Sequence, residues 1–443
     1  MDASKTLITK VYRHFMHDSL YRNSIFLIAS TAVAAISGYI FWIICARLFT
    51  SDQVGLATTI ISSVALISSF SLMGYNTALI RYINSPSRAE RINTIVTLVS
   101  LVAAVVSLIF ILGTSIFSPK LAFIHHDKWL ALLFVIASII TANSTILDSV
   151  FVGNRRADLV FMKGTVTGVV KLVLPFALVG LGATGIFLAN TFAMFAALLI
   201  ATSLLHYKFK HIIKPQVSTG IIIEMSRFSF GNYTASFVEG STALVLPIII
   251  INHLSASMSG YFYIVMMITS ALYIIPVAVS QVTFAEGAHD TDSLHSTLVR
   301  SIRLIYLALV PAIIAIIALG KTILSAFGKS YVVNGYSLLI LLVLASIPVG
   351  IKLLANVLFN IENKVGLIII TNAVTVASVL TLSFTLITKG LIGIGVAWLS
   401  GETIGTLLAI YLVISRTDTL KSHLYKLKSF DLYSLWQKKP PIS

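Results

Sequence analysis

Long uninterrupted runs of apolar residues dominate the chain, and short polar segments separate them. A membrane-spanning helix needs about 20 consecutive, mostly apolar residues. The runs are continuous, whereas the strands of a membrane β-barrel alternate apolar and polar residues over about 10 positions. The pattern therefore predicts helices. Twelve runs are long enough to span a membrane: 24–46, 54–80, 94–117, 129–152, 159–181, 184–205, 229–252, 260–284, 301–325, 337–360, 365–388 and 391–415.

The predicted fold class is an all-α, polytopic membrane protein with about 12 transmembrane helices. The longest connection between runs, residues 206–228, has 23 residues, so we expect no separate domain between the spans. The first run is too long for the apolar region of a signal peptide, which has about 7–15 residues. We therefore expect an uncleaved first span.

The composition supports this class and excludes others. Hydrophobic residues make up 57% of the chain and charged residues 11%, whereas soluble domains carry about 25% charged residues. A soluble enzyme, a DNA-binding protein and a disordered scaffold are therefore excluded. The single cysteine, Cys45, excludes an intrachain disulfide and a multi-cysteine metal site.

The positive charge of the chain predicts its orientation. A net charge of +15 would suggest nucleic-acid binding in a soluble protein. In a membrane protein it reflects the Lys and Arg that gather in cytoplasmic loops, so we expect no nucleic-acid partner. With a cytoplasmic N-terminus, 23 of the 31 Lys and Arg residues fall on the inner side, 6 on the outer side and 2 within spans. This bias places both termini in the cytoplasm.

The loops indicate an internal repeat. Three pairs of similar segments occur in the same order, at matching loops of the two halves. Six spans per half is an even number, so the halves insert with the same orientation, and such parallel repeats place a central cavity between two lobes. The pairs are Arg47–Gly55 with Asn252–Gly260, 205 positions apart, and Gly182–Gly185 with Gly390–Gly393 and Arg155–Arg156 with Asn363–Lys364, both 208 positions apart.

We therefore expect two six-helix lobes with basic, amphipathic ends. Apolar residues recur at helical spacing among basic ones near both termini, which is typical of helices that lie on anionic lipids. The predicted parts are a cytoplasmic amphipathic segment (1–23), an N-lobe (24–205), a cytoplasmic linker (206–228), a C-lobe (229–415) and a basic cytoplasmic tail (416–443).

Three segments resemble the multidrug/oligosaccharidyl-lipid/polysaccharide (MOP) exporter superfamily. Residues 46–56, ARLFTSDQVGL, resemble the "ARLLTPEEFGLYA" connection after the first span of that family. Residues 73–82, MGYNTALIRY, are similar to its "GLxxALVRY" motif, and residues 327–331, FGKSY, to its "FGxxY" element. Ser51 stands where family members carry Pro, and Ser can also cap a helix start.

Within the superfamily, the chain most resembles the polysaccharide-transport branch, including Wzx-type O-antigen flippases. The resemblance implies movement of an undecaprenyl-pyrophosphate-linked oligosaccharide across the bacterial inner membrane, by alternating access. Besides this substrate, it implies other polysaccharide-assembly proteins as partners.

Ionisable side chains inside spans are candidate site residues, because burying a charge in the bilayer is costly. A pyrophosphate requires cations, and Lys171 and Lys352 lie in opposite lobes. Arg47, at the outer end of the first span, and Arg81, at the inner end of the second, are candidate exit and entry contacts. The alternatives are that the arginines anchor the interface and that Lys171 pairs with a buried carboxylate.

Three carboxylates are candidates for ion coupling: Asp148, Glu239 and Glu402. A carboxyl group buried in a span can bind and release a proton as its cavity faces either side, which would couple transport to H+ or Na+. The alternative is a structural role, such as a pair of Glu239 or Glu402 with Lys171.

No cofactor is expected. A Walker A motif is absent, so ATP is not the direct energy source. His125–His126 has no third ligand at suitable spacing, so we expect no metal site.

Two alternatives to a flippase stay open: a cation-coupled multidrug antiporter of the same fold, and a non-transporting membrane enzyme of glycan assembly. Cations facing the cavity would favour the flippase, and an acidic, aromatic cavity the antiporter. An enzyme would need clustered loop carboxylates. Asp290 and Asp292 are close together, but His, Thr and Ser flank them, as in an ordinary solvated loop.

Overall fold

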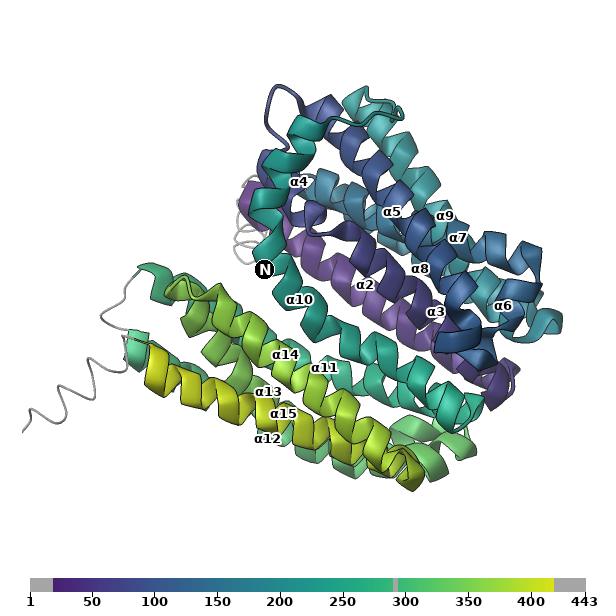
Figure 1. The fold of residues 1–443 in the computed structure, drawn as a ribbon, viewed down its shortest axis with the longest axis vertical. Helices are drawn as coiled ribbons and strands as arrows, with labels where there is room; N and C mark the ends of the chain where they lie inside the picture. Colours follow the sequence, from purple (N-terminus) through teal and green to yellow (C-terminus); the bar gives the residue numbers. More distant parts are fainter. Residues whose placement is uncertain (1–18, 290–293, 418–443) are drawn as a thin grey trace, which may run out of the picture. The chain divides into compact units, whose positions relative to one another are not determined.

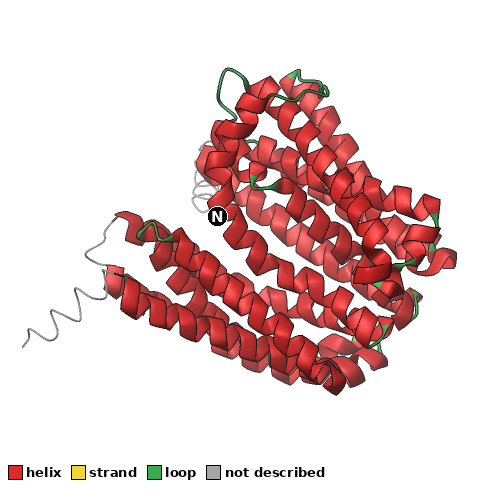
Figure 2. Cartoon of the chain, viewed as in Figure 1, coloured by secondary structure: helices red, strands yellow, loops and turns green. Residues whose placement is uncertain are grey.

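A computed structural model describes residues 19–289 and 294–417, and this part of the chain is built from helices and short loops (Figures 1 and 2). The Asp290–Asp292 loop and the amphipathic segments predicted before residue 19 and after residue 417 lie outside the described residues. The helices are α2 (Ser19–Leu48), α3 (Ser51–Leu72), α4 (Tyr75–Tyr82), α5 (Arg88–Phe117), α6 (Phe123–His126), α7 (Lys128–Gly153), α8 (Ala157–Ala177), α9 (Gly182–Phe209), α10 (Thr219–His253), α11 (Ala256–His289), α12 (Leu294–Ser325), α13 (Lys329–Ile361), α14 (Val365–Leu386) and α15 (Gly390–Arg416).

The structure confirms an all-helical, multi-pass membrane protein. In the described residues, 11 helical segments are long and apolar enough to cross a membrane. The last of them, residues 365–416, is divided by a short 3-10 helix, Ile387–Lys389, into α14 and α15. Each of the twelve predicted spans therefore falls on a helical segment.

The second predicted span, 54–80, is not one helix. It breaks at Met73 and Gly74, whose φ values of 47° and 78° are left-handed, so α3 ends and α4 begins. A Cβ on Gly74 would lie 2.8 Å from the Cβ of Tyr233 in α10, so α10 packs closely on the break. The Tyr233 hydroxyl lies 2.9 Å from the carbonyl oxygens of both Ser69 and Phe70 and donates to them at the end of α3, where the Phe70 carbonyl also accepts from the Met73 N–H at 3.2 Å.

The backbone confirms the internal repeat. Arg155 and Asn363 both have φ of 57°, and Gly182 and Gly390 have φ of 57° and 65°. Short 3-10 helices precede both glycines, at Val179–Leu181 and at Ile387–Lys389. These pairs are separated by the 208 positions found in the sequence, so equivalent loops of the two halves have the same local fold.

The chain forms two compact units. Unit 1 comprises the residues up to Ile264 together with residues 323–335, and unit 2 comprises Val265–Thr322 and the residues from Tyr336 onward. Unit 1 therefore includes α10, which packs against α3 and α4. The division falls later in the chain than the lobe boundary predicted from the repeat, and the lobe limits of 205 and 229 stay predictions.

Candidate functional site

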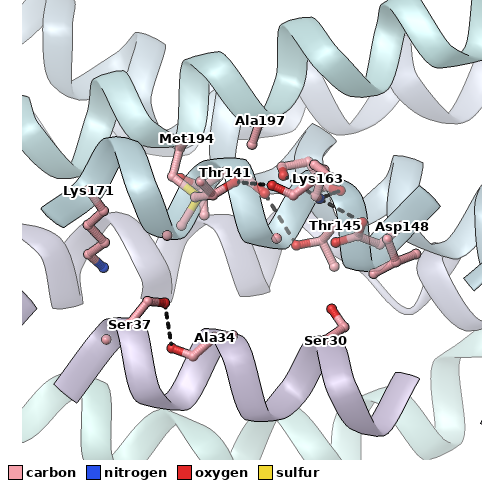
Figure 3. A pocket seen from close by; sticks show the side chains of 16 residues that line it. Ser30, Ala34, Ser37, Thr141, Thr145, Asp148, Lys163, Lys171, Met194 and Ala197 are labelled. Carbon is pink, nitrogen blue, oxygen red and sulfur yellow. Dashed lines mark hydrogen bonds and ion pairs between the residues drawn. The ribbon is translucent and has the colours of Figure 1, made fainter. Parts of the chain in front are cut away.

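A cavity of about 270 Å³ lies within unit 1, between α2, α7, α8 and α9 (Figure 3). Three of these helices line it with polar side chains at helical spacing, so each presents a polar stripe within an apolar span. α9 contributes Met194 and Ala197. The polar lining residues are Ser30 and Ser37 of α2, Thr141, Ser144, Thr145 and Asp148 of α7, and Lys163, Thr167 and Lys171 of α8.

Two glycines bring α2 and α8 together beside this cavity. A Cβ on Gly168 would lie 3.0 Å from the Cβ of Ser37, and one on Gly164 would lie 3.4 Å from the Oγ of Ser30. Small residues four positions apart allow membrane helices to approach closely. A larger residue at Gly168 would therefore separate the helices that form the cavity wall.

One end of the cavity holds an ion pair between a buried lysine and a partly exposed aspartate. The Nζ of Lys163 lies 2.6 Å from a carboxylate oxygen of Asp148, and the ammonium also donates to the carbonyl and hydroxyl oxygens of Ser144, at 3.1 and 2.9 Å. Asp148 lies near the end of α7 and Lys163 near the start of α8, so the short connection places them at similar depth. The pair is neutral as a whole.

Lys171 lines the other end of the cavity, two turns deeper along α8. Eight residues separate it from Lys163, which is about 12 Å along a helix axis. Its Nζ lies 4.5 Å from the ring centre of Phe41, a cation–π contact. Among the described residues it forms no ion pair or hydrogen bond. Figure 3 shows Lys171 and the Lys163–Asp148 pair at opposite ends of the cavity.

Lys352 and Glu402 lie in unit 2 and form a buried pair. The Nζ of Lys352 is 2.7 Å from Oε2 of Glu402, and 2% and 10% of the two side chains are exposed. The charge of Lys352 is therefore met by a carboxylate in this structure. The binding and coupling roles expected of these two residues stay predictions, and both would require the pair to open.

The predicted arginines lie at helix ends. Arg47 donates from Nε and Nη2 to the carbonyl oxygens of Ala326 and Ser325, at 2.8 and 2.6 Å, and so caps the C-terminus of α12. Arg81 is exposed on α4 and contacts the Tyr82 ring, at 5.8 Å from its centre. Glu239 is half-buried on α10, outside the residues that line the cavity. The substrate and coupling roles of these three residues stay predictions.

The segment ARLFTSDQVGL holds the starts of α3 and α11 together, within unit 1. The Asp52 carboxylate accepts from the backbone N–H and the hydroxyl of Ser257, and so caps α11. A Cβ on Gly55 would lie 1.6 Å from the carbonyl oxygen of Ala256, so no side chain fits there. The resemblance noted in the sequence therefore corresponds to a defined helix contact, which we call the Gly55 crossing.

Comparison with known proteins decides the family. The sequence model of a family described as "Polysaccharide biosynthesis protein" matches residues 20–284. This chain belongs to that family. None of the curated proteins compared matches the chain.

Solved structures of MOP transporters share the fold of this polysaccharide biosynthesis protein. An inward-facing multidrug resistance MATE family transporter of the MOP superfamily is 13% identical, covers 89% of this chain and 99% of its own, and has a TM-score of 0.69. The lipid II flippase MurJ, in an inward closed conformation, is 15% identical, covers 94% of each chain and has a TM-score of 0.68. A MOP superfamily transporter from Pyrococcus furiosus is 12% identical, covers 91% of this chain and 96% of its own, and has a TM-score of 0.54. The chain therefore shares the fold of MOP superfamily transporters, and its family match agrees with the resemblance to the polysaccharide branch noted in the sequence.

The sequence analysis of this family member missed Lys163 and the polar stripes. Lys163 was counted with the inner loops, although it is buried beside Asp148. Two signals could have revealed the site. Thr141, Ser144, Thr145 and Asp148 follow helical spacing in an apolar run, and Asp148 and Lys163 lie at similar distances from the tight connection between two antiparallel spans.

Proposed function

We propose that this protein is a flippase, which moves an undecaprenyl-pyrophosphate-linked oligosaccharide, such as an O-antigen unit or another surface polysaccharide unit, from the inner to the outer leaflet of the bacterial inner membrane by alternating access. The family match supports polysaccharide assembly as the process. The fold shared with the lipid II flippase MurJ and with multidrug transporters supports transport rather than catalysis.

The observation that carries the proposal is that Lys171 lines the cavity and forms no ion pair with a carboxylate among the described residues. A lysine inside a span is costly to bury, by at least about 2.5–3.5 kcal/mol on the insertion scale. Asp148 is matched by Lys163, which leaves Lys171 as the net charge of the cavity. An anionic phosphate group is the partner that such a cavity favours, with the surrounding Ser and Thr hydroxyls as further donors.

The multidrug antiporter is the alternative that the fold alone would allow. Its cationic substrates would favour a cavity with net negative charge. Two lysines and one aspartate line the described cavity of unit 1, which gives the opposite sign. The charge of the cavity therefore favours the flippase.

Coupling to H+ or Na+ is part of the same proposal. Of the three predicted carboxylates, Asp148 lines this cavity. We expect Asp148→Asn to reduce the dependence of export on an imposed ion gradient in proteoliposomes. Unchanged dependence would exclude Asp148 from coupling.

Substitution of Lys171 tests the proposed function. In cells that depend on this gene for a surface glycan, Lys171→Gln should abolish glycan export at normal protein abundance. Lys171→Arg keeps the charge and can still bind phosphate, so it should retain part of the export. The control is Lys120→Gln, which removes an exposed lysine outside the cavity.

Two outcomes would contradict the assignment. Full export by Lys171→Gln at normal abundance would remove the residue from the site. Unchanged surface glycan combined with increased sensitivity to cationic dyes, in cells lacking the protein, would favour the antiporter.

A further inference from the structure

A second cavity, of about 460 Å³, lies at the end of α9. It is formed by the last turns of α9 and by the linker that follows, and it shares no lining residue with the Lys171 cavity. Hydroxyl and imidazole groups face it from Thr202, Ser203, His206, Tyr207 and His211, and two linker isoleucines complete the wall. The Thr202 hydroxyl donates to the carbonyl oxygen of Leu198, whereas the Ser203 and Tyr207 hydroxyls and the His206 imidazole are suited to donate hydrogen bonds to an anion.

Positive charge gathers around this cavity without a balancing carboxylate in the same segment. Residues 200–218 contain Lys208, Lys210 and Lys214 and no Asp or Glu. Arg88 of α5 adds a guanidinium, whose carbon lies 4.8 Å from the ring centre of Phe209. The Nη2 of Arg88 is buried and has no hydrogen-bond partner among the described residues. Arg88 is not one of the residues that line the cavity, so its guanidinium adds positive charge near the cavity without a direct contact to a ligand.

The linker that forms one wall is held in place by α5. Oδ1 of Asn93 accepts hydrogen bonds from the Lys214 backbone N–H, at 3.1 Å, and from Nε2 of His211, at 3.0 Å. Its Nδ2 donates to Oε1 of Gln216, at 3.3 Å, and the Gln216 N–H donates to the Thr97 hydroxyl, at 3.2 Å. The cavity is therefore preformed, which reduces the entropy lost on binding.

The electrostatic environment of His211 reports the same excess of positive charge. Burial lowers its pKa, and the nearby Arg88 and Lys214 lower it further. Arg88 and Lys214 therefore lie close enough to this wall of the cavity to act on a charge there.

The rim of the cavity is apolar where the span ends. α9 is apolar enough to cross the membrane and ends at Phe209. Tyr207 and Ile212 are 71% and 60% exposed. A polar pocket with an exposed apolar rim at the end of a span matches a ligand that has both a charged headgroup and acyl chains. Basic pockets of this kind on the cytoplasmic side bind anionic lipid headgroups.

We propose that this cavity binds the phosphate headgroup of an anionic glycerophospholipid of the inner leaflet. The Ser203 and Tyr207 hydroxyls and the His206 imidazole donate to the phosphate, the lysines of residues 208–214 attract it from around the cavity, and Ile212 contacts the acyl chains. The proposal rests on the inner orientation of residues 206–228 and is independent of the role of Lys171.

Native mass spectrometry of the full-length protein tests this site. The purified protein is incubated with equal amounts of phosphatidylglycerol and phosphatidylcholine, and the retained lipids are counted. We expect preferential retention of phosphatidylglycerol. The variant Lys210→Gln/Lys214→Gln/His206→Ala changes three exposed residues and should lower this retention by about tenfold, since each basic residue adds to the attraction of an anionic lipid.

The matched control is Lys120→Gln/Lys128→Gln, which removes two exposed lysines elsewhere and should retain the lipid as the wild type does. Lys171→Gln should also retain it, which separates this site from the proposed transport site. Equal retention of the two lipids, or equal loss in the control, would overturn the proposal. Displacement of the lipid by millimolar inorganic phosphate would identify a soluble phosphate as the ligand instead. Displacement by an equimolar polyprenyl diphosphate would assign the cavity to the transport substrate.

Discussion

Charged side chains inside the spans differ in whether an opposite charge neutralises them. Lys352 has Glu402 in unit 2, and Lys163 has Asp148 in unit 1. Lys171 instead contacts the ring of Phe41 and lines the cavity of unit 1. A buried pair offsets much of the desolvation that burial imposes, whereas a single buried charge has no such compensation. The partner of a charge, rather than its presence in a span, therefore distinguishes structural from ligand-binding candidates.

The Lys352–Glu402 pair gives a prediction about stability. Lys352→Met and Glu402→Leu each leave one buried charge unmatched, which should lower the free energy of unfolding by about 3–5 kcal/mol. The double variant removes both charges and should recover most of the loss. Thermal unfolding in detergent measures this. A stable double variant that has lost glycan export would instead show that the pair takes part in transport.

His211 gives a prediction about pH. Its pKa in the folded protein lies below the ordinary value of about 6.5, and NMR of labelled histidine measures it. At a pH between the folded and the unfolded pKa of His211, the unfolded chain binds more protons than the folded one. His211 therefore makes the free energy of unfolding fall as the pH drops through about 6.5. Arg88→Gln removes a nearby cation and should raise the pKa. A lower pKa in that variant would contradict the assigned cause.

Helix contacts in unit 1 depend on glycines at close approaches. The Gly55 crossing brings the starts of α3 and α11 together, and a Cβ at either Gly55 or Gly260 would meet backbone atoms of the other helix. Arg47 and Asp52 flank the crossing and cap the ends of α12 and α11. One short segment of sequence therefore ties down three helix ends.

Substitution at this crossing should loosen it. In a Cys45→Ala background, Asp52→Cys and Ser257→Cys should cross-link under copper-catalysed oxidation, since the native side chains are in contact. Adding Gly55→Ala should lower the yield several-fold, because its Cβ cannot be accommodated. Gly38→Ala is the matched control, since a Cβ there meets nothing within 4 Å. An unchanged yield with Gly55→Ala would show that the crossing is not as close as the structure has it.

The sequence predicted the helices well and the site only in part. Apolar runs of spanning length determine helices directly, because lipid leaves the backbone no other way to satisfy its hydrogen bonds. The break at Met73–Gly74 was missed because both residues fit an apolar run, and the contact of Gly74 with Tyr233 of α10 is a tertiary one that the run does not show. Asp148 and Lys171 were identified by their charge, whereas the partner of each residue depends on tertiary contacts that a single sequence does not show.

The whole molecule combines a repeated backbone with an uneven charge distribution. Equivalent loops of the two halves have matching φ values, while 23 of the 31 basic residues fall on one predicted side of the membrane. The internal repeat is a property of the backbone fold, and the bias of Lys and Arg predicts which side of the membrane each loop faces.

Labelling tests this orientation. In the Cys45→Ala background, single cysteines at Lys120 and Val217, both exposed, report opposite sides. A membrane-impermeant maleimide added to spheroplasts should label Lys120→Cys and should reach Val217→Cys only after the membrane is permeabilised. The reverse pattern would exclude cytoplasmic termini, and with them the inner-leaflet assignment of the lipid site.

The Gly55 crossing has a consequence for the origin of the protein. Gly55 and Gly260 are equivalent positions of the two halves, 205 residues apart, and a Cβ on Gly260 would lie 3.2 Å from the Cα of Gly55. In a symmetric homodimer, the residue that lies on the two-fold axis meets its own copy in the partner. The two glycines meet in this way within one chain. A gene duplication that fused the subunits of an ancestral dimer would leave such a contact, with the former symmetry axis passing between the two glycines.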